Sequence, residues 1–209
     1  MNTKSALTYG PAFVGAGVWA FARFPDQLAW AAGAYGKAFG AISAFYEDWT
    51  RVEGYGEALH EALKELRNPP ATALDLATGT GYVARTIARR YPTAQVTGVD
   101  ITPEMLGIAQ HQSVAEGLEV TFSEADSSDL PFEDDSFDLV VIQNSLVYPE
   151  EMVRVTAPGG RAIVVFSFAG PWVKLAWPAL ADRFTNGGAD QTWGHRAGAG
   201  YYGVAWCSK

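Results

Sequence analysis

The sequence predicts an α/β fold in which a mostly parallel, doubly wound sheet carries helices on both faces. One observation is that strand-like and helix-like stretches alternate after residue 69, a pattern typical of parallel strands joined by crossover helices. The other is residues 73–84, Ala-Leu-Asp-Leu-Ala-Thr-Gly-Thr-Gly-Tyr-Val-Ala. They predict a buried strand, a tight glycine turn and a helix start, which together begin a nucleotide-binding fold.

The remaining elements follow in chain order. Strands are expected near residues 72–77, 95–100, 119–123, 137–143 and 160–167, with helices near 80–91, 103–116, 149–156 and 172–184. A terminal hairpin is expected to have strands at 189–193 and 201–207, joined by a turn at 194–200. Helix-like spacing at 25–49 and 54–66 ends at Asn68-Pro69-Pro70, because proline stops a helix. Residues 1–68 are therefore expected to form a helical cap or lid of the same domain, and residues 69–209 its core.

Bulk properties narrow the possible partners. The chain has 209 residues, a net charge of −8 and a pI of about 4.8, so nucleic acid is an improbable partner. Arg85, Arg89 and Arg90 are expected to form the solvated side of a helix. Cys207 is the single cysteine, which fits a reducing cytoplasm and leaves no cysteine metal site. The apolar run at 10–22 is too short to span a bilayer, so stable membrane insertion is not expected.

The glycine turn carries the chemistry. Gly79 and Gly81 allow a ligand to approach the backbone, and the free N–H groups of a helix start can bind polar ligand groups. The strand at 95–100 ends in Asp100, nineteen positions after Gly81. A carboxylate there can accept hydrogen bonds from both hydroxyls of a ribose. These features predict an adenosine-containing ligand.

Five segments resemble motifs of the class I S-adenosylmethionine (SAM)-dependent methyltransferases. The first of these segments is similar to the first motif of the quinone-methylating branch of that family. Asp75-Leu76-Ala77-Thr78-Gly79-Thr80-Gly81 is similar to that motif, with Ala77 in place of its first glycine. The other four segments are 99–106, 124–132, 136–144 and 154–161. The resemblance implies a seven-stranded sheet of order 3-2-1-4-5-7-6 whose last strand is antiparallel. It also implies SAM as cofactor and S-adenosylhomocysteine as product.

The resemblance assigns roles to particular residues. In the family pattern Asp126 binds the adenine amino group, Ile101 packs on the adenine and Asp75 faces the methionine part. The residues expected to bind the cofactor are Tyr46, Asp75, Ala77, Thr78, Gly79, Gly81, Asp100, Ile101, Met105, Ala125, Asp126, Ser127, Gln143 and Asn144. Asp126 has an alternative role as the cap of the turn before Leu130.

The N-terminal aromatic residues have two interpretations, as core or as a lid over the sulfonium. In the lid interpretation Tyr46 and Trp49 lie near the sulfonium, with Tyr35 or Tyr55 further out. No catalytic residue is identified; Tyr46 and His195 are the candidates. No cluster has metal-ligand spacing. The segment 144–148 differs from the Asn/Asp-Pro-Pro-Tyr/Phe signature of enzymes that methylate planar amino groups.

The predicted function is transfer of a methyl group from SAM to a small or medium-sized, fairly apolar acceptor, mainly by proximity and desolvation. Methylation at O, N, C or S is left open, as is a homodimer. Two alternatives remain. One is a SAM-fold binding or regulatory protein without methyl transfer, and the other is an NAD-dependent oxidoreductase.

Overall fold

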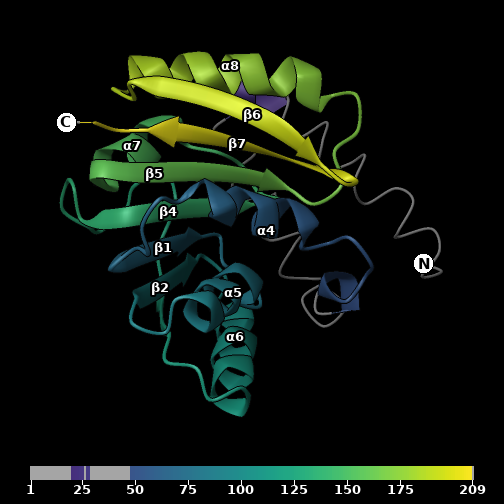
Figure 1. Ribbon diagram of the computed structural model, residues 1–209, viewed down its shortest axis with the longest axis vertical. Coiled ribbons are helices and arrows are strands. Elements are labelled where there is room, and N and C mark those ends of the chain that lie inside the picture. Colours follow the sequence, from purple (N-terminus) through teal and green to yellow (C-terminus); the bar gives the residue numbers. More distant parts are fainter. Residues whose placement is uncertain (1–19, 26, 29–47, 209) are drawn as a thin grey trace.

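A seven-stranded sheet forms the centre of the computed structural model, which describes residues 20–25, 27–28 and 48–208 (Figure 1). Its strand order is β3-β2-β1-β4-β5-β7-β6, which confirms the predicted order. The strands are β1 (Thr72–Leu76), β2 (Gln95–Asp100), β3 (Thr121–Glu124), β4 (Phe137–Gln143), β5 (Thr156–Phe166), β6 (Gln191–Ala197) and β7 (Gly200–Trp206). The helices are α4 (Glu57–Ala62), the 3-10 turn η1 (Leu63–Glu65), α5 (Tyr82–Arg90), α6 (Pro103–Ala115), α7 (Pro149–Val155) and α8 (Val173–Asn186).

Pairing follows the predicted mixed pattern. Strands β1 to β5 pair in parallel, and β7 lies antiparallel between β5 and the edge strand β6. Successive residues point to opposite faces: Leu74 and Leu76 pack with α7 and α8, whereas Ala73 packs with α4 and α5. The chain therefore changes from one face to the other between β1 and β4. In such sheets ligands bind beyond the carboxyl ends of the strands at this switch point.

The terminal hairpin differs from its prediction. The turn was expected at 194–200, but residues 194–197 belong to β6 and Gly200 begins β7, so the turn lies between Ala197 and Gly200. The reason is packing: Tyr201 and Trp177 lie so close to Gly194 that a side chain there would overlap the tyrosine. Glycine therefore marks a close contact within a strand here, and not a bend.

Two further predictions need correction. The fifth strand begins at Thr156 rather than at residue 160, with an irregular register opposite Phe137 and Leu139. Arg85 is not on the solvated side of its helix; it is buried and hydrogen-bonds to Glu116, which also binds Arg89. The two arginines thus attach α5 to the end of α6.

The N-terminal segment is only partly described. Residues 20–23 are helical and Phe21 and Ala22 are buried, whereas the predicted helix at 25–49 lies largely outside the described residues. Helix α4 packs on the sheet face formed by β5 and β7. The division into a cap at 1–68 and a core at 69–209 stays a prediction. Among the described residues, no helix is long and apolar enough to cross a membrane.

Close packing of α8 on the sheet gives a stability prediction. A Cβ at Gly203 of β7 would overlap the Trp177 ring, so Gly203→Ala is expected to lower the free energy of unfolding by about 1–3 kcal/mol. Gly107→Ala is the matched control, because nothing lies within 4 Å of its Cβ position; it should unfold at or above the parent temperature. Equal melting temperatures for the two variants would contradict this packing account.

Candidate cofactor site

The loop after β1 turns sharply through three residues with left-handed backbone. Ala77 has φ 49°, Gly79 φ 55° and Gly81 φ 81°. The Gly81 N–H donates to the Thr78 carbonyl at 2.8 Å, and Gly81 then begins α5. Alanine occupies a left-handed position with some strain, which explains why the related motif has glycine at Ala77. The loop brings its backbone and the start of α5 to the switch point.

Asp100 joins this loop to the end of β2. Its Oδ2 accepts the Gly79 N–H at 2.9 Å, and its Oδ1 accepts the Thr102 N–H at 2.9 Å. Burial raises the pKa of this carboxyl group, while these backbone hydrogen bonds act in the opposite direction. Each carboxylate oxygen has a further lone pair. Asp100 can thus hold the loop and still accept hydrogen bonds from a ligand.

Asp75 lies on β1, one residue before the end of the strand, and is almost completely buried. Its Oδ2 accepts hydrogen bonds from Thr78 Oγ1 at 2.5 Å and from the Ala84 N–H at 3.0 Å. Its Oδ1 has no hydrogen-bond partner among the described residues, and neither has the Thr80 hydroxyl. Burial raises the pKa of Asp75 to about 7. A buried acceptor of this kind suits a cationic or hydrogen-donating ligand group.

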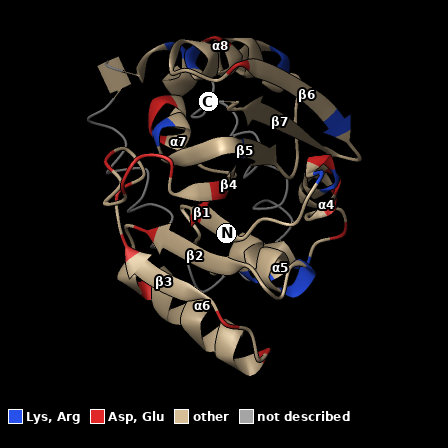
Figure 2. Ribbon diagram, turned by 60° about the vertical axis from the view of Figure 1, so that its left-hand side comes forward, with Lys and Arg blue, Asp and Glu red and all other residues tan. Residues whose placement is uncertain are grey.

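The carboxyl edge of β1, β2 and β3 is acidic. Figure 2 shows acidic colour at the tips of β2 and β3. Residues 76–84, 101–110 and 125–132 contain no lysine or arginine. The nearest cation, Arg85, bonds the Gly81 carbonyl and is paired with Glu116. A phosphate group at this edge would thus lie beside Asp75 and Asp100 and close to no cation but an already paired one, whereas a positively charged ligand would be attracted.

The residues expected around the adenine lie on the neighbouring loops. Ile101 is 42 % exposed, while Met105 and Ala125 are buried. Asp126 is exposed, and its Oδ1 accepts hydrogen bonds from the N–H and the hydroxyl of Ser128. Asp126 therefore caps its own turn. A second role at the adenine edge stays a prediction, because a carboxylate can accept several hydrogen bonds.

A buried polar cluster closes the other side of the switch point. Ser167 Oγ accepts hydrogen bonds from Gln143 Nε2 at 2.7 Å and from Asn144 Nδ2 at 2.9 Å. Asn144 has φ 54°, an uncommon conformation that often marks a functional site. Sequence reasoning proposed Gln143 and Asn144 but missed Ser167, because only the pairing of β4 with β5 brings it beside them.

Aromatic side chains flank the carboxyl edge on both faces. Tyr55 is buried and meets Tyr82 edge-on at 5.0 Å and Phe168 at 6.3 Å. On the other face Phe21 meets Tyr148 edge-on at 5.2 Å. The pKa of Tyr148 is raised to about 12, chiefly by burial and also by Asp126, so its phenol stays protonated near neutral pH and is no general base.

Two residues were candidates for a catalytic role. Tyr46 lies outside the described residues, and His195 does not lie at the β1–β4 switch point. His195 is exposed on β6, the outer strand, which β7 and β5 separate from β4. Within the described part of the chain, no group of three His, Cys, Asp or Glu side chains could hold a metal ion.

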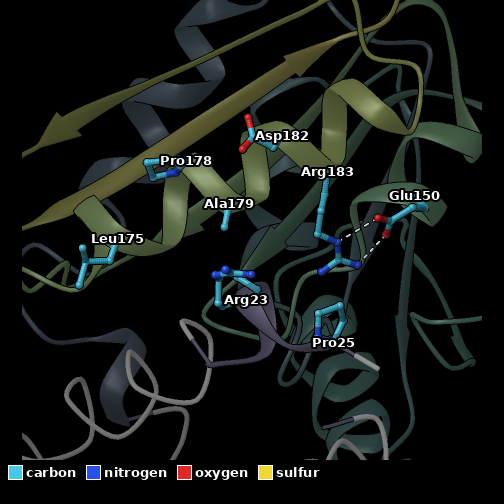
Figure 3. Close-up of a pocket in the computed structure, with 9 residues that line it drawn as sticks. Arg23, Pro25, Glu150, Leu175, Pro178, Ala179, Asp182 and Arg183 are labelled. Atoms are coloured by element: carbon cyan, nitrogen blue, oxygen red, sulfur yellow. Dashed lines mark hydrogen bonds and ion pairs between the residues drawn. The ribbon is translucent and has the colours of Figure 1, made fainter. Parts of the chain in front are cut away.

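A groove of about 870 Å³ lies beside this edge, between residues 22–25 and α8 (Figure 3). Arg183 crosses one end and donates to both Glu150 oxygens, at 2.9 and 2.6 Å. Leu175, Pro178 and Ala179 form its apolar side.

The raised pKa of Asp75 gives a prediction about pH. Its folded-state pKa is about 7 against an ordinary 3.8, so between these values the folded state binds the proton more strongly than the unfolded state. This carboxyl group therefore makes stability fall as pH rises from about 4 to about 7, and adds no further change above. Urea unfolding should be measured for the parent and for Asp75→Asn at about pH 5 and about pH 8. From the lower to the higher pH, the parent should lose stability relative to the variant. The same difference at both values would contradict the burial argument.

Comparison with known proteins agrees with this geometry. Residues 73–160 match a family model described as a methyltransferase domain. A demethylmenaquinone methyltransferase of Thermus thermophilus is 41 % identical over 144 residues, which cover 64 % of this chain and 65 % of that protein. A malonyl-[acyl-carrier protein] O-methyltransferase of Methylococcus capsulatus is 31 % identical over 72 % of this chain and 58 % of its own length. The chain thus matches less than two thirds of the length of each of these two relatives.

Solved structures share the fold. A methyltransferase solved in complex with the Haloferax volcanii Trm112 methyltransferase activator has a TM-score of 0.68 at 18 % identity, covering 82 % of this chain and 98 % of that one. A SAM-dependent methyltransferase from Aquifex aeolicus has a TM-score of 0.62 at 18 % identity, covering 79 % and 97 %. The sheet order and these structures show that the chain has the fold of SAM-dependent methyltransferases, and residues 73–160 match a methyltransferase domain.

Proposed function

We propose that the protein binds SAM at the carboxyl edge of β1, β2 and β4 and transfers its methyl group to a small or medium-sized, fairly apolar acceptor. The observation that carries the proposal is the hydrogen bond from the Gly79 N–H to Asp100. It fixes the glycine turn against the carboxylate that would bind the ribose, so both parts of an adenosine site are placed together.

The charge of this edge favours SAM over a dinucleotide. NAD carries a pyrophosphate, which would lie beside the buried Asp75 and Asp100, while the nearby Arg85 is buried and already paired with Glu116. SAM carries a positive sulfonium and an ammonium group instead. Opposite charges favour the SAM complex, most strongly where water is excluded. This argument supports methyl transfer from SAM over the NAD-dependent oxidoreductase alternative.

The residues of the site fit the parts of SAM. Asp100 would accept the ribose hydroxyls, and Ile101 and Asp126 would contact the adenine. Gly79 would allow close approach of the ligand to the backbone, and the unpartnered oxygens of Asp75 and Gln143 would face the methionine part. When bound, SAM supplies a methyl group that its sulfonium already activates.

The residues of the chain then have to bind SAM, orient the acceptor and exclude water from the site. Tyr55 and Tyr82 would cover the site from the α4 and α5 side, and Phe21 and Tyr148 from the α7 side. An enclosed site raises the rate by holding the nucleophile in line with the methyl group and by removing water. The N-terminal segment that contains Tyr46 is proposed to complete this enclosure as a lid.

The aromatic walls support a planar, apolar acceptor. We propose a molecule of the quinone class, because a relative at 41 % identity is a demethylmenaquinone methyltransferase and edge-on aromatic pairs accommodate flat rings. A second relative acts on malonyl-[acyl-carrier protein]. Malonyl-[acyl-carrier protein] is therefore the alternative acceptor, and methylation of it is the alternative outcome of the experiment below.

Two measurements test the proposed function. Mass spectrometry of the protein as purified should detect SAM or S-adenosylhomocysteine, since such ligands often co-purify. Incubation of the protein with SAM and reduced demethylmenaquinone should then produce S-adenosylhomocysteine faster than incubation of the protein with SAM alone. Binding of SAM without turnover on the quinol or on malonyl-[acyl-carrier protein] would instead support the non-methylating alternative.

A further inference from the structure

Ser167 lies one residue beyond β5 and is fully buried at the same edge of the sheet. Its Oγ accepts hydrogen bonds from the amide nitrogens of Gln143 and Asn144, at 2.7 and 2.9 Å. Its own N–H donates to Asn144 Oδ1 at 2.9 Å. Because Asn144 both donates to and accepts from Ser167, its orientation is fixed. Ser167 Oγ in turn determines which way the Gln143 amide points.

This hydrogen bond leaves the Gln143 oxygen without a partner. Gln143 is 6 % exposed, and its Oε1 is buried and has no hydrogen bond among the described residues. An acceptor left in this state costs free energy unless a ligand supplies a donor. The cost indicates that the oxygen is held ready for a donor.

The direction of that oxygen follows from the strand geometry. Val141 of β4 pairs with Asp75 of β1, and Gln143 follows two residues later on the same face. Asp75 also has an unpartnered buried oxygen. Two acceptor groups, one of them able to carry charge, thus lie on one face at the β1–β4 switch point.

We propose that Ser167 is a positioning residue that holds the Gln143 oxygen as an acceptor for the ammonium group of SAM. This inference rests on the proposed function. An ammonium group has three donors and no acceptor, so it matches a carbonyl oxygen on the same face of the sheet as a carboxylate. Ser167 acts through Gln143 and need not touch the ligand.

The test compares SAM with 5′-methylthioadenosine, which has the adenosine part but no amino acid. Isothermal titration of the full chain should show that Ser167→Ala weakens SAM binding about tenfold and changes 5′-methylthioadenosine binding less than about twofold. Ser113→Ala is the control. Ser113 is also fully buried, but lies on α6 with no hydrogen-bond partner for its hydroxyl among the described residues, so both ligands should bind as in the parent.

A double-mutant cycle separates positioning from a general structural role. Gln143→Ala should show the same selective loss, and adding Ser167→Ala to it should cost no further SAM affinity. Ser167→Cys, with a weak acceptor of similar size, replaces the alanine variant if that variant does not fold. Equal loss of both ligands, no loss, or additive losses would overturn the inference while leaving the proposed function intact. A parent that binds neither ligand would instead refute the proposed function, and the inference with it.

Discussion

Replacing Gly79 with valine is expected to abolish SAM binding, with a loss of more than about 100-fold in affinity, or about 3 kcal/mol. Gly79 has φ 55°, which a β-branched residue adopts only with strain. Its N–H also donates to Asp100 at 2.9 Å, so a shifted backbone would release the carboxylate that is proposed to bind the ribose. The branched side chain would in addition occupy space that the ligand needs.

Gly117→Val is the matched control for backbone strain. Gly117 also has a positive φ, 67°, and nothing lies within 4 Å of its Cβ position at the end of α6. Both variants should lose stability, and isothermal titration should show that only Gly79→Val loses SAM. If Gly79→Val stays folded and binds SAM like the parent, the cofactor lies elsewhere.

Replacing Asp100 with alanine is expected to weaken SAM binding by at least about tenfold. The carboxylate would accept two ribose hydroxyls, and a hydrogen bond to a charged group contributes about 1.5–3 kcal/mol. The variant also loses the bonds to Gly79 and Thr102, so part of the effect comes from the loop. Asp100→Asn keeps one acceptor oxygen and should lie between the parent and the alanine variant.

Asp138→Ala controls for the loss of backbone hydrogen bonds. Asp138 Oδ2 accepts two backbone N–H groups, from Ala71 at 2.7 Å and from Thr72 at 3.1 Å, near the amino end of β4. This aspartate thus has a comparable structural role at the opposite edge of the sheet. Its variant should unfold at a lower temperature and still bind SAM like the parent, whereas SAM binding unaffected by Asp100→Ala would contradict the ribose assignment.

The sheet was predictable because its signals are local. Alternating apolar and polar stretches located β1, β2 and β4 almost to the residue, and the glycine turn located the start of α5. The hairpin was misplaced because Gly194 reports a contact with Tyr201 and Trp177, and a contact across elements leaves no local pattern. Arg85 was misjudged for the same reason, since its partner Glu116 is 31 residues away.

The meeting of the proposed site residues was predictable to the same extent, while their roles stay predictions. Asp75, Gly79 and Asp100 belong to one strand–turn–helix unit and its neighbour, so the order of residues fixed their meeting. The link between Ser167 and Gln143 depends on the pairing of β5 with β4, which the sequence does not specify locally. The unpartnered oxygens of Asp75 and Gln143 also become visible only when every neighbouring donor is placed.

Equilibrium binding of SAM, S-adenosylhomocysteine and NADH to the full chain tests the central claim most directly. The acidic carboxyl edge and the Gly79–Asp100 bond predict micromolar binding of both S-adenosyl compounds and no measurable binding of NADH. Asp75→Asn, titrated in parallel, should lose affinity for SAM as a buried acceptor charge is removed. Binding of NADH in preference to SAM would contradict the account.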